Sequence, residues 1–168
     1  QCYPCDAIVN NVVSEYNGLG YSGTNSGGSL YITSSIFRNN KGGLAPNTLD
    51  SELLPPERET FIIGNLIENN NNYNSPATNS TYLSYGNGVV IAGGNNNIIK
   101  NNVIVDHDLY GVILTASMDV NYWPAHGNRV EENLILSSRK ADIAVSGVSN
   151  LANCFEGNYF NTSIPPGL

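Results

Sequence analysis

Charged residues are scarce in this sequence. Asp, Glu, Lys and Arg make up only 12% of its 168 residues, and seven Lys and Arg stand against fourteen Asp and Glu. The formal net charge of −7 leaves no basic stripe to follow a phosphate backbone, so the composition excludes nucleic acid as a partner. The polar surface is built instead from amides and hydroxyls, with asparagines in runs such as Asn69 to Asn72 and Asn95 to Asn97.

Long hydrophobic runs are missing as well. No apolar stretch approaches the ~20 residues that a helix needs to cross a bilayer, so we expect no membrane span. The stretch Gln1 to Cys5 lacks the basic and then apolar order of a signal peptide, so the chain is either mature or a piece of a longer protein. Its low lysine content and the sequons Asn79 to Thr81 and Asn161 to Ser163 favour an extracellular, periplasmic or cell-surface location.

Cysteine is rare, with only three residues in the chain. Cys2 and Cys5 form a C-x-x-C pair that no histidine follows, which excludes haem attachment, and a second pair of soft ligands for zinc is missing. We expect Cys2 and Cys5 to form a small disulfide or to remain as thiols in a turn, and Cys154 to be buried in the core. The sequence indicates no resident metal or cofactor, apart from the calcium ion considered below.

Helical periodicity is also absent, whereas β-branched residues cluster in runs of three to five, so we predict an all-β fold. Six stretches share a pattern of two short apolar runs with a small polar residue between them. They are Ile8 to Val13, Tyr31 to Phe37, Phe61 to Ile67, Ile98 to Ile104, Arg129 to Ile135 and Cys154 to Phe160. One aligned column reads Asn11, Ser35, Asn65, Asn102, Asn133 and Asn158.

A third apolar run follows most of these stretches. The third runs are Gly18 to Tyr21, Gly43 to Ala45, Gly88 to Ile91, Gly111 to Leu114 and Asp142 to Val145. A repeat of three short strands predicts a parallel β-helix solenoid of about six coils, within a single domain spanning residues 1–168. Stacked coils bring like residues to about 4.8 Å, so the aligned column is expected to form a hydrogen-bonded asparagine ladder.

Both ends of such a stack expose unpaired strand edges and open core. The first predicted coil begins almost at residue 1, and the last ends in Ile164 to Leu168. Neither end has an evident cap in the sequence. We therefore expect either further coils or a protein partner at the ends.

Four stretches resemble a known group of proteins: CYPCD (2–6), EYNGLGYSGTN (15–25), GNGVVIAGG (86–94) and NCFEGN (153–158). They are similar to the secreted right-handed parallel β-helix repeat family, allied in fold to pectate lyases and to periplasmic β-helix proteins of nitrous-oxide-reductase maturation. The resemblance covers essentially the whole chain and implies a right-handed coil. It points to a bacterial branch without a settled activity, whose members have further coils before the C-x-x-C stretch.

Asp106-His107-Asp108 is the sharpest candidate for chemistry. In β-helix lyases and epimerases that act on uronate polymers, a side chain removes the proton beside a carboxyl group, and a cation neutralises that carboxylate. His107 could be such a base, with Asp106 or Asp108 orienting it or binding a metal ion, and Arg139 or Lys140 of the next coil neutralising the substrate carboxylate. The competing interpretation is a plain polar turn, because every predicted coil has polar residues at these places.

Two insertions could build a binding side on the solenoid. Thr115 to Gly127 carries Tyr122, Trp123 and His126, which could contact a sugar ring, although Trp123 could equally pin its loop against the coil. Pro46 to Arg58 carries three acidic residues that could bind calcium, although they lack a spaced acidic motif. These are Asp50, Glu52 and Glu57. The loop from Asn72 to Tyr85 is either a lid or a tolerated insertion.

These observations favour a β-helix binding or scaffold module that presents loops to a glycan, a polysaccharide or a partner protein. The fold signature is complete, whereas the set of catalytic residues is not. A polysaccharide lyase or epimerase and a structural subunit of a larger assembly are the alternatives.

Overall fold

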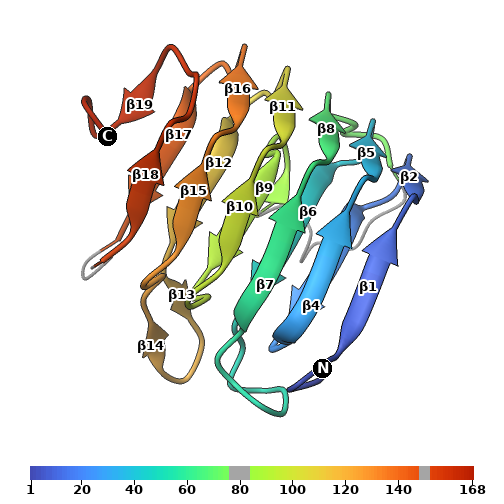
Figure 1. The fold of residues 1–168 in the computed structure, drawn as a ribbon, viewed down its shortest axis with the longest axis vertical. Coiled ribbons are helices and arrows are strands. Elements are labelled where there is room, and N and C mark those ends of the chain that lie inside the picture. The colour runs from blue at the N-terminus through green and yellow to red at the C-terminus, as the bar shows by residue number, and fades with distance from the viewer. Residues whose placement is uncertain (76–83, 148–151) are drawn as a thin grey trace.

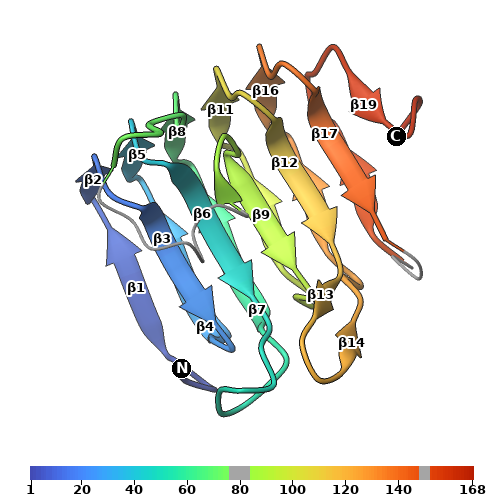
Figure 2. The same ribbon diagram turned by 180° about the vertical axis from the view of Figure 1, so that it is seen from behind.

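The computed structural model describes residues 1–75, 84–147 and 152–168. These residues form an all-β fold with three parallel sheets of stacked strands, and they contain no α-helix (Figures 1 and 2). The arrangement is consistent with the predicted solenoid of stacked coils. We call each consecutive set of strands, one from each sheet, a coil, and the sixth coil contributes strands to the first and third sheets only.

The first sheet contains the first strand of every coil: β1 (Ala7–Asn10), β4 (Gly27–Thr33), β7 (Arg58–Ile63), β10 (Ile98–Lys100), β15 (Arg129–Glu131) and β18 (Cys154–Glu156). The second contains β2 (Val13–Glu15), β5 (Ile36–Arg38), β8 (Leu66–Glu68), β11 (Val103–Val105) and β16 (Leu134–Leu136). The third contains β3 (Leu19–Thr24), β6 (Gly42–Asn47), β9 (Val89–Ala92), β12 (Tyr110–Thr115), β17 (Ala141–Ser146) and β19 (Ser163–Ile164). A separate antiparallel hairpin joins β13 (Ser117–Met118) to β14 (Tyr122–Trp123).

At the corners of the coils the chain passes through residues with positive φ. Between the first and second strands these residues are Asn11, Ser34, Gly64, Asn101, Glu132 and Gly157. Between the second and third strands they are Tyr16, Asn39, Asn69, Asp106 and Ser137. Before the first strand they are Asp6, Asn96, Gly127 and Ala152, and in the second and third coils the equivalent residues, Ser29 and Glu59, lie within the first residues of β4 and β7. Asparagine and glycine tolerate this left-handed conformation best, which gives one physical reason for their abundance here.

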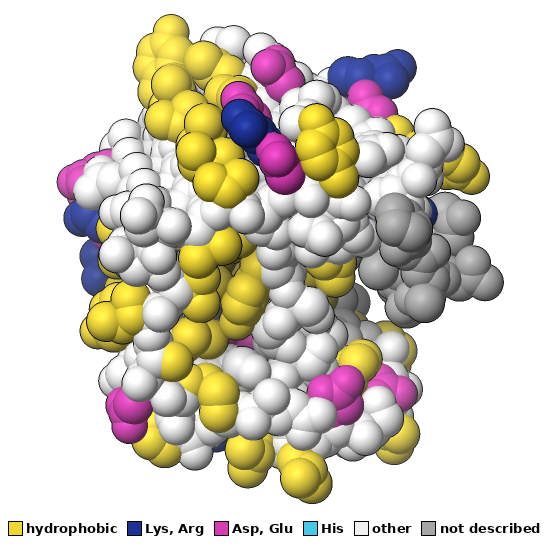
Figure 3. Space-filling model, turned by 90° about the vertical axis from the view of Figure 1, so that its right-hand side faces the viewer, with side chains coloured by type: hydrophobic (Ala, Val, Ile, Leu, Met, Phe, Trp, Pro, Cys, Tyr) yellow, Lys and Arg dark blue, Asp and Glu magenta, His cyan; other side chains and the backbone are white. Residues whose placement is uncertain are grey.

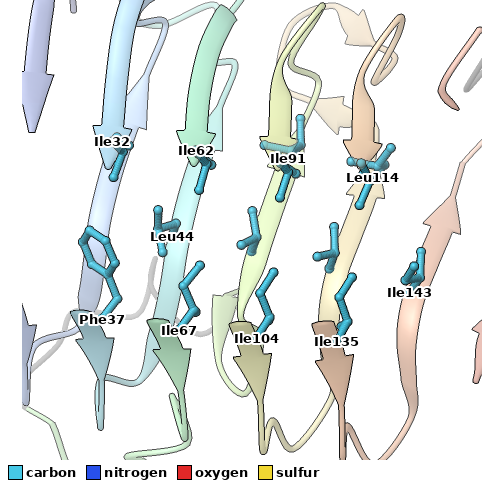
Figure 4. Close-up of a cluster of buried hydrophobic side chains, with 14 of the residues drawn as sticks. Ile32, Phe37, Leu44, Ile62, Ile67, Ile91, Ile104, Leu114, Ile135 and Ile143 are labelled. Carbon is cyan, nitrogen blue, oxygen red and sulfur yellow. The ribbon is translucent and has the colours of Figure 1, made fainter. Parts of the chain in front are cut away.

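The core is a set of mostly aliphatic side chains, together with the aromatic ring of Phe37, that point inward between the three sheets (Figure 4). Parallel pairing stacks like positions from coil to coil, so Ile62 of β7 lies beside Ile32 of β4 and Ile99 of β10. All three of these side chains are fully buried. Their short strands alternate inward and outward residues, which is why two-residue periodicity is visible in the sequence.

The predicted asparagine ladder is confirmed between the first and second strands. The Nδ2 groups of Asn65, Asn102 and Asn133 each donate to the Oδ1 of the next asparagine, at 2.9 to 3.0 Å, and the ladder ends at Asn158. Each of these residues also donates its backbone N–H to the same oxygen. Ser35 keeps its place in this row, because its N–H donates to Asn65 Oδ1.

The placement of Asn11 in this ladder was wrong by one residue. The backbone N–H of Val12 donates to Ser35 Oγ, and the register pairs Val13 with Ile36, so Val12 occupies the ladder position of the first coil. Asn11 is exposed at the preceding corner, with φ of 57°. Two adjacent asparagines, one of which supplies the left-handed corner, made the alignment ambiguous in the sequence.

The cysteines follow the prediction in part. Cys2 and Cys5 form a disulfide. The prediction for Cys154 was wrong, because its thiol is free and exposed. Its register with Arg129 places it on the outward row of the first sheet, since the inward position of β18 belongs to the next residue, Phe155.

Each sheet ends in a strand that pairs with no further strand among the described residues, although β16 still pairs with Tyr159 through an isolated bridge. β1, β2 and β3 form one edge, and β18, β16 and β19 the other. Figure 3 looks onto the edge that holds β1 and β2, where hydrophobic side chains are visible in a hollow between the sheets. A search of the described residues finds no helix long and apolar enough to span a membrane.

Candidate functional site

An open groove of about 720 Å³ lies on the outer face of the third sheet. Outward residues of consecutive strands form its floor: Ala45 of β6, Val90 of β9 and Ile113 of β12. Hydroxyl and amide side chains line the groove beside them, from residues Ser22, Thr24, Asn47, Asn87, Thr115 and Ser117. The groove therefore combines an apolar base with many neutral hydrogen-bonding groups.

Two loops that are distant in sequence join to form one wall of this groove. Asp50, on the insertion of the second coil, accepts hydrogen bonds from Asn121 N–H, from Asn121 Nδ2 and from Trp123 Nε1, at 2.6 to 3.0 Å. In return, Asp119 Oδ2 accepts the N–H of Ser51 at 3.1 Å. We call this set of contacts the clasp. The hydrogen bonds from Asn121 and Trp123 lower the pKa of Asp50, so the carboxylate form holds the clasp.

The clasp closes over the short turn of the third coil, which lies between the two insertions. Ser117 Oγ donates to Thr48 O across this turn at 2.7 Å. A Cβ atom at Gly93 would lie 2.8 Å from Trp123 Cβ and 2.9 Å from Ser117 Cβ, and Gly93 also has a φ of 71°. Glycine at this position is therefore required both by space and by backbone conformation.

A smaller hollow adjoins the groove at Leu109. Here Asp108 Oδ2 accepts a hydrogen bond from Tyr85 OH at 2.6 Å, and Asp108 Oδ1 lies 3.4 Å from Arg139 Nη1. The hydrogen bond to Asp108 raises the pKa of Tyr85. Lys140 Nζ lies 5.0 Å from the ring centroid of Tyr110, which also lines the groove. The sequence correctly placed Asp108 and Arg139 together.

His107 does not join this cluster, because its side chain points into the core and is only 1% exposed. Its Nδ1 accepts the N–H of Asn70 at 3.4 Å, and its Nε2 lies 3.3 Å from Ile67 O. The amide of Asn70 makes the matching contacts one coil earlier, since its Oδ1 accepts Asn40 N–H and its Nδ2 donates to Phe37 O.

His107 is thus a member of a second ladder, in which the imidazole replaces an asparagine amide. The contacts require the neutral tautomer with hydrogen on Nε2. Burial lowers the pKa of His107 to about 4, which keeps this neutral form. A buried imidazole with both nitrogens engaged is not placed to remove a proton from a bound polymer, so the geometry argues against His107 as the base considered in the lyase alternative.

The other residues singled out from the sequence are dispersed. Asp106 is exposed at a positive-φ corner, as its turn interpretation requires. Trp123 is half-buried in the clasp and pins its loop, and the adjacent Tyr122 is 39% exposed. His126 is exposed near the corner before the first sheet, where its backbone pairs with Asn95, and it does not line the groove.

The three acidic residues considered for calcium do not converge. Asp50 holds the clasp, Glu52 accepts a hydrogen bond from Gln1 Nε2, and Glu57 is fully buried in the core. Within the described residues, no group of three or more His, Cys, Asp or Glu could hold a metal ion. The sequon at Asn79 and most of the loop from Asn72 to Tyr85 lie outside the described residues.

Comparison with known proteins adds no relative, because no family model matches the chain and no curated protein matches it.

Two further ladders in the structure were not predicted from the sequence. Asn97 and Asn128 donate their Nδ2 groups along a third ladder that ends at Asn153, before the first strand of each coil. Asn40, Asn70 and His107 form the second ladder, between the second and third strands. Each of these residues follows directly after a positive-φ corner residue, so a search for polar pairs at every corner could have found them.

Proposed function

We propose that this protein is a right-handed parallel β-helix module, located outside the cytoplasm, that binds a glycan in the groove on its third sheet. The groove itself carries the proposal. Sugar rings present apolar CH faces and a rim of hydroxyl groups, and the groove offers an apolar floor beside neutral hydrogen-bonding side chains. A rigid stack that holds two clasped loops suits binding, because little of the site must become ordered when a ligand arrives.

The test is a screen of neutral and acidic oligosaccharides, followed by NMR titration of the best ligand. The variant Ala45→Phe should fill the groove floor and weaken binding at least tenfold, because Ala45 faces outward in the middle of the floor. The matched control Thr33→Phe adds the same ring to the outer face of the first sheet and should bind normally. Shift changes confined to residues outside the groove would reject the proposal.

A lyase or epimerase acting on uronate polymers is the second candidate. The observation that favours it is the cluster of Asp108, Arg139 and Tyr85 beside the groove, since Arg139 could neutralise a substrate carboxylate. Incubation with uronate polymers would yield unsaturated products that absorb near 235 nm, roughly the enoate band, or an epimerised product visible by NMR. Activity that disappears in Arg139→Ala but persists in His107→Asn would support this candidate with a different base.

A structural subunit in a larger assembly is the third candidate. An outward apolar row runs along the second sheet: Val13, Ile36, Leu66, Val103, Leu134 and Tyr159. Val13 and Tyr159, at its two ends, are 56% and 65% exposed. Figure 3 shows hydrophobic side chains gathered at the top of the molecule, where β2 lies. Large exposed apolar patches mark interaction surfaces. If this row joins subunits, the sedimentation coefficient of Leu134→Ser should differ from that of the wild type.

A further inference from the structure

Glu57 is a carboxyl group enclosed by the core. It is 0% exposed, and its two oxygens accept hydrogen bonds from Thr60 Oγ1 and Asn97 Nδ2, both at 2.8 Å. In later coils the corresponding Nδ2 groups of the third ladder donate to backbone carbonyls, as Asn128 does to Gly94 O. The Glu57 side chain therefore takes the place of a backbone carbonyl at this rung.

The same residue ties the insertion of the second coil to the rest of the molecule. The N–H of Glu57 donates to Thr48 Oγ1 at 3.0 Å, and that hydroxyl donates to Gly93 O at 2.7 Å. On the other side, Asn95 N–H donates to Glu57 O at 2.9 Å. The first and last residues of the segment from Thr48 to Glu57 are thus fixed to each other and to the turn of the third coil.

Burial favours the protonated acid of Glu57 and outweighs the hydrogen bonds from Thr60 and Asn97, which favour the carboxylate. Tyr21 of β3 and Arg58 are the titratable groups whose charges act on Glu57 or respond to it. The Arg58 guanidinium is engaged elsewhere, 3.6 Å from the ring centroid of Tyr3 and donating to Pro56 O. Burial raises the pKa of Glu57 to about 8 and that of Tyr21 to about 12.

We propose that Glu57 is a proton-dependent latch for the groove wall. With the proton in place, the carboxylic acid sits in the core and holds the segment from Thr48 to Glu57 against the third coil. When the proton leaves to solvent, the carboxylate is drawn toward water, because a buried charge without a cation is costly. The outward movement separates Asp50 from Trp123, so the clasp opens and the groove loses one wall.

The latch involves no ligand and operates whether or not the groove binds a glycan. Leu49 and Glu52 line the groove on the segment that would move. A groove function of any kind would therefore be present at neutral pH and lost in alkaline solution.

Trp123 is the single tryptophan of the chain and a partner in the clasp, so its fluorescence reports the latch. With excitation at a wavelength selective for tryptophan, the wild type should show a red shift of several nanometres with a midpoint near pH 8. Glu57→Gln should show no transition in this range, because it keeps the shape of the side chain and every other titratable group. Asp50→Asn should show the red-shifted emission already at pH 7.

Far-UV circular dichroism followed in parallel separates latch opening from unfolding. The β-sheet signal should stay constant through the fluorescence transition. A wild-type midpoint that persists in Glu57→Gln would overturn the proposal, as would a transition that coincides with loss of the sheet signal. If Glu57→Gln fails to fold, Glu57→Asp gives the second test, since the shorter acid should shift the pH midpoint of the fluorescence transition. The emission of Asp50→Asn should not change with pH across the same range.

Discussion

At the scale of single residues, the protein relies on side-chain amides that complete the backbone hydrogen bonds at each corner. A corner interrupts the backbone hydrogen bonding between stacked strands and leaves buried N–H and C=O groups that need other partners. Asn102 satisfies Ile62 O with its Nδ2 and the N–H of Asn65 with its Oδ1. The amides are therefore structural, and the scarcity of charged residues reflects an interior and surface built with neutral polar groups.

Asn102→Ala is expected to lower the free energy of unfolding by roughly 2 to 4 kcal/mol, because several buried groups lose their partners at once. Urea denaturation at pH 7 measures this loss. Asn102→Ser should cost less, since Ser35 fills the same row in the second coil. The control Asn101→Gly changes only the exposed corner residue and should stay within about 0.5 kcal/mol of the wild type. Equal stability of all three variants would contradict the ladder.

His107→Asn is expected to fold with a stability within about 1 kcal/mol of the wild type at pH 7, because Asn40 and Asn70 hold the same row. His107→Leu has a similar volume but cannot accept the Asn70 N–H, so it should lose about 2 kcal/mol or more. Denaturant unfolding compares the two. A more stable leucine variant would mean that the imidazole contributes packing alone.

At the scale of elements, each coil consists of very short strands separated by single-residue corners. Strands such as β5, β8, β10 and β11 have three residues each, which is too short to be stable alone. Their parallel neighbours above and below provide the stability, and the left-handed corners fix which residues point inward. Corners occupied by glycine or asparagine carry less backbone strain than those occupied by other residues.

Gly64 offers the cleanest test of this corner strain. Its φ is 67°, and a Cβ atom there would meet nothing within 4 Å, so the cost of a side chain is conformational alone. Gly64→Ala should destabilise the protein by about 1 kcal/mol, and Gly64→Asn by less, because asparagine tolerates this conformation. Thermal denaturation of the pair measures the difference. A larger loss for asparagine than for alanine would exclude this explanation.

At the scale of the whole molecule, two buried titratable side chains make the free energy of unfolding depend on pH in opposite directions. His107 stays neutral in the folded protein down to a pKa of about 4, against 6.5 in its ordinary state. Burial raises the pKa of Glu57 from its ordinary value of 4.5 to about 8, so Glu57 stays protonated in the folded protein at neutral pH. Between pH 4.5 and 6.5 the folded state holds the Glu57 proton and the unfolded state holds the His107 proton, so their effects on stability cancel.

In the wild type, the contribution of this pair to the free energy of unfolding should therefore not change between pH 4.5 and 6.5. Between pH 6.5 and 8 the unfolded state binds fewer protons, so stability should fall by roughly 2 kcal/mol in total. Glu57→Gln should reveal stability that rises from pH 4 to 6.5 and is then level. His107→Asn should reveal stability that falls from pH 4.5 to 8. Denaturant midpoints measured across this pH range test the direction of each change in stability. Midpoints of the two variants that rise and fall together with pH would contradict these directions.

The sequence by itself determined the strand content, the repeat of three short strands and the first asparagine ladder. These features follow from local sequence patterns, namely β-branched runs and one polar residue that recurs from coil to coil. It also placed Asp108 near Arg139, because stacked coils bring equivalent turns together.

Only the tertiary structure decided which way each corner residue points. One left-handed residue shifts the inward face by a single position, and that shift moved Asn11 out of the ladder and turned His107 into the core. The clasp between Asp50 and Trp123 and the burial of Glu57 depend on loops from different coils. No local pattern records these contacts, because they arise only when the stack brings distant segments side by side.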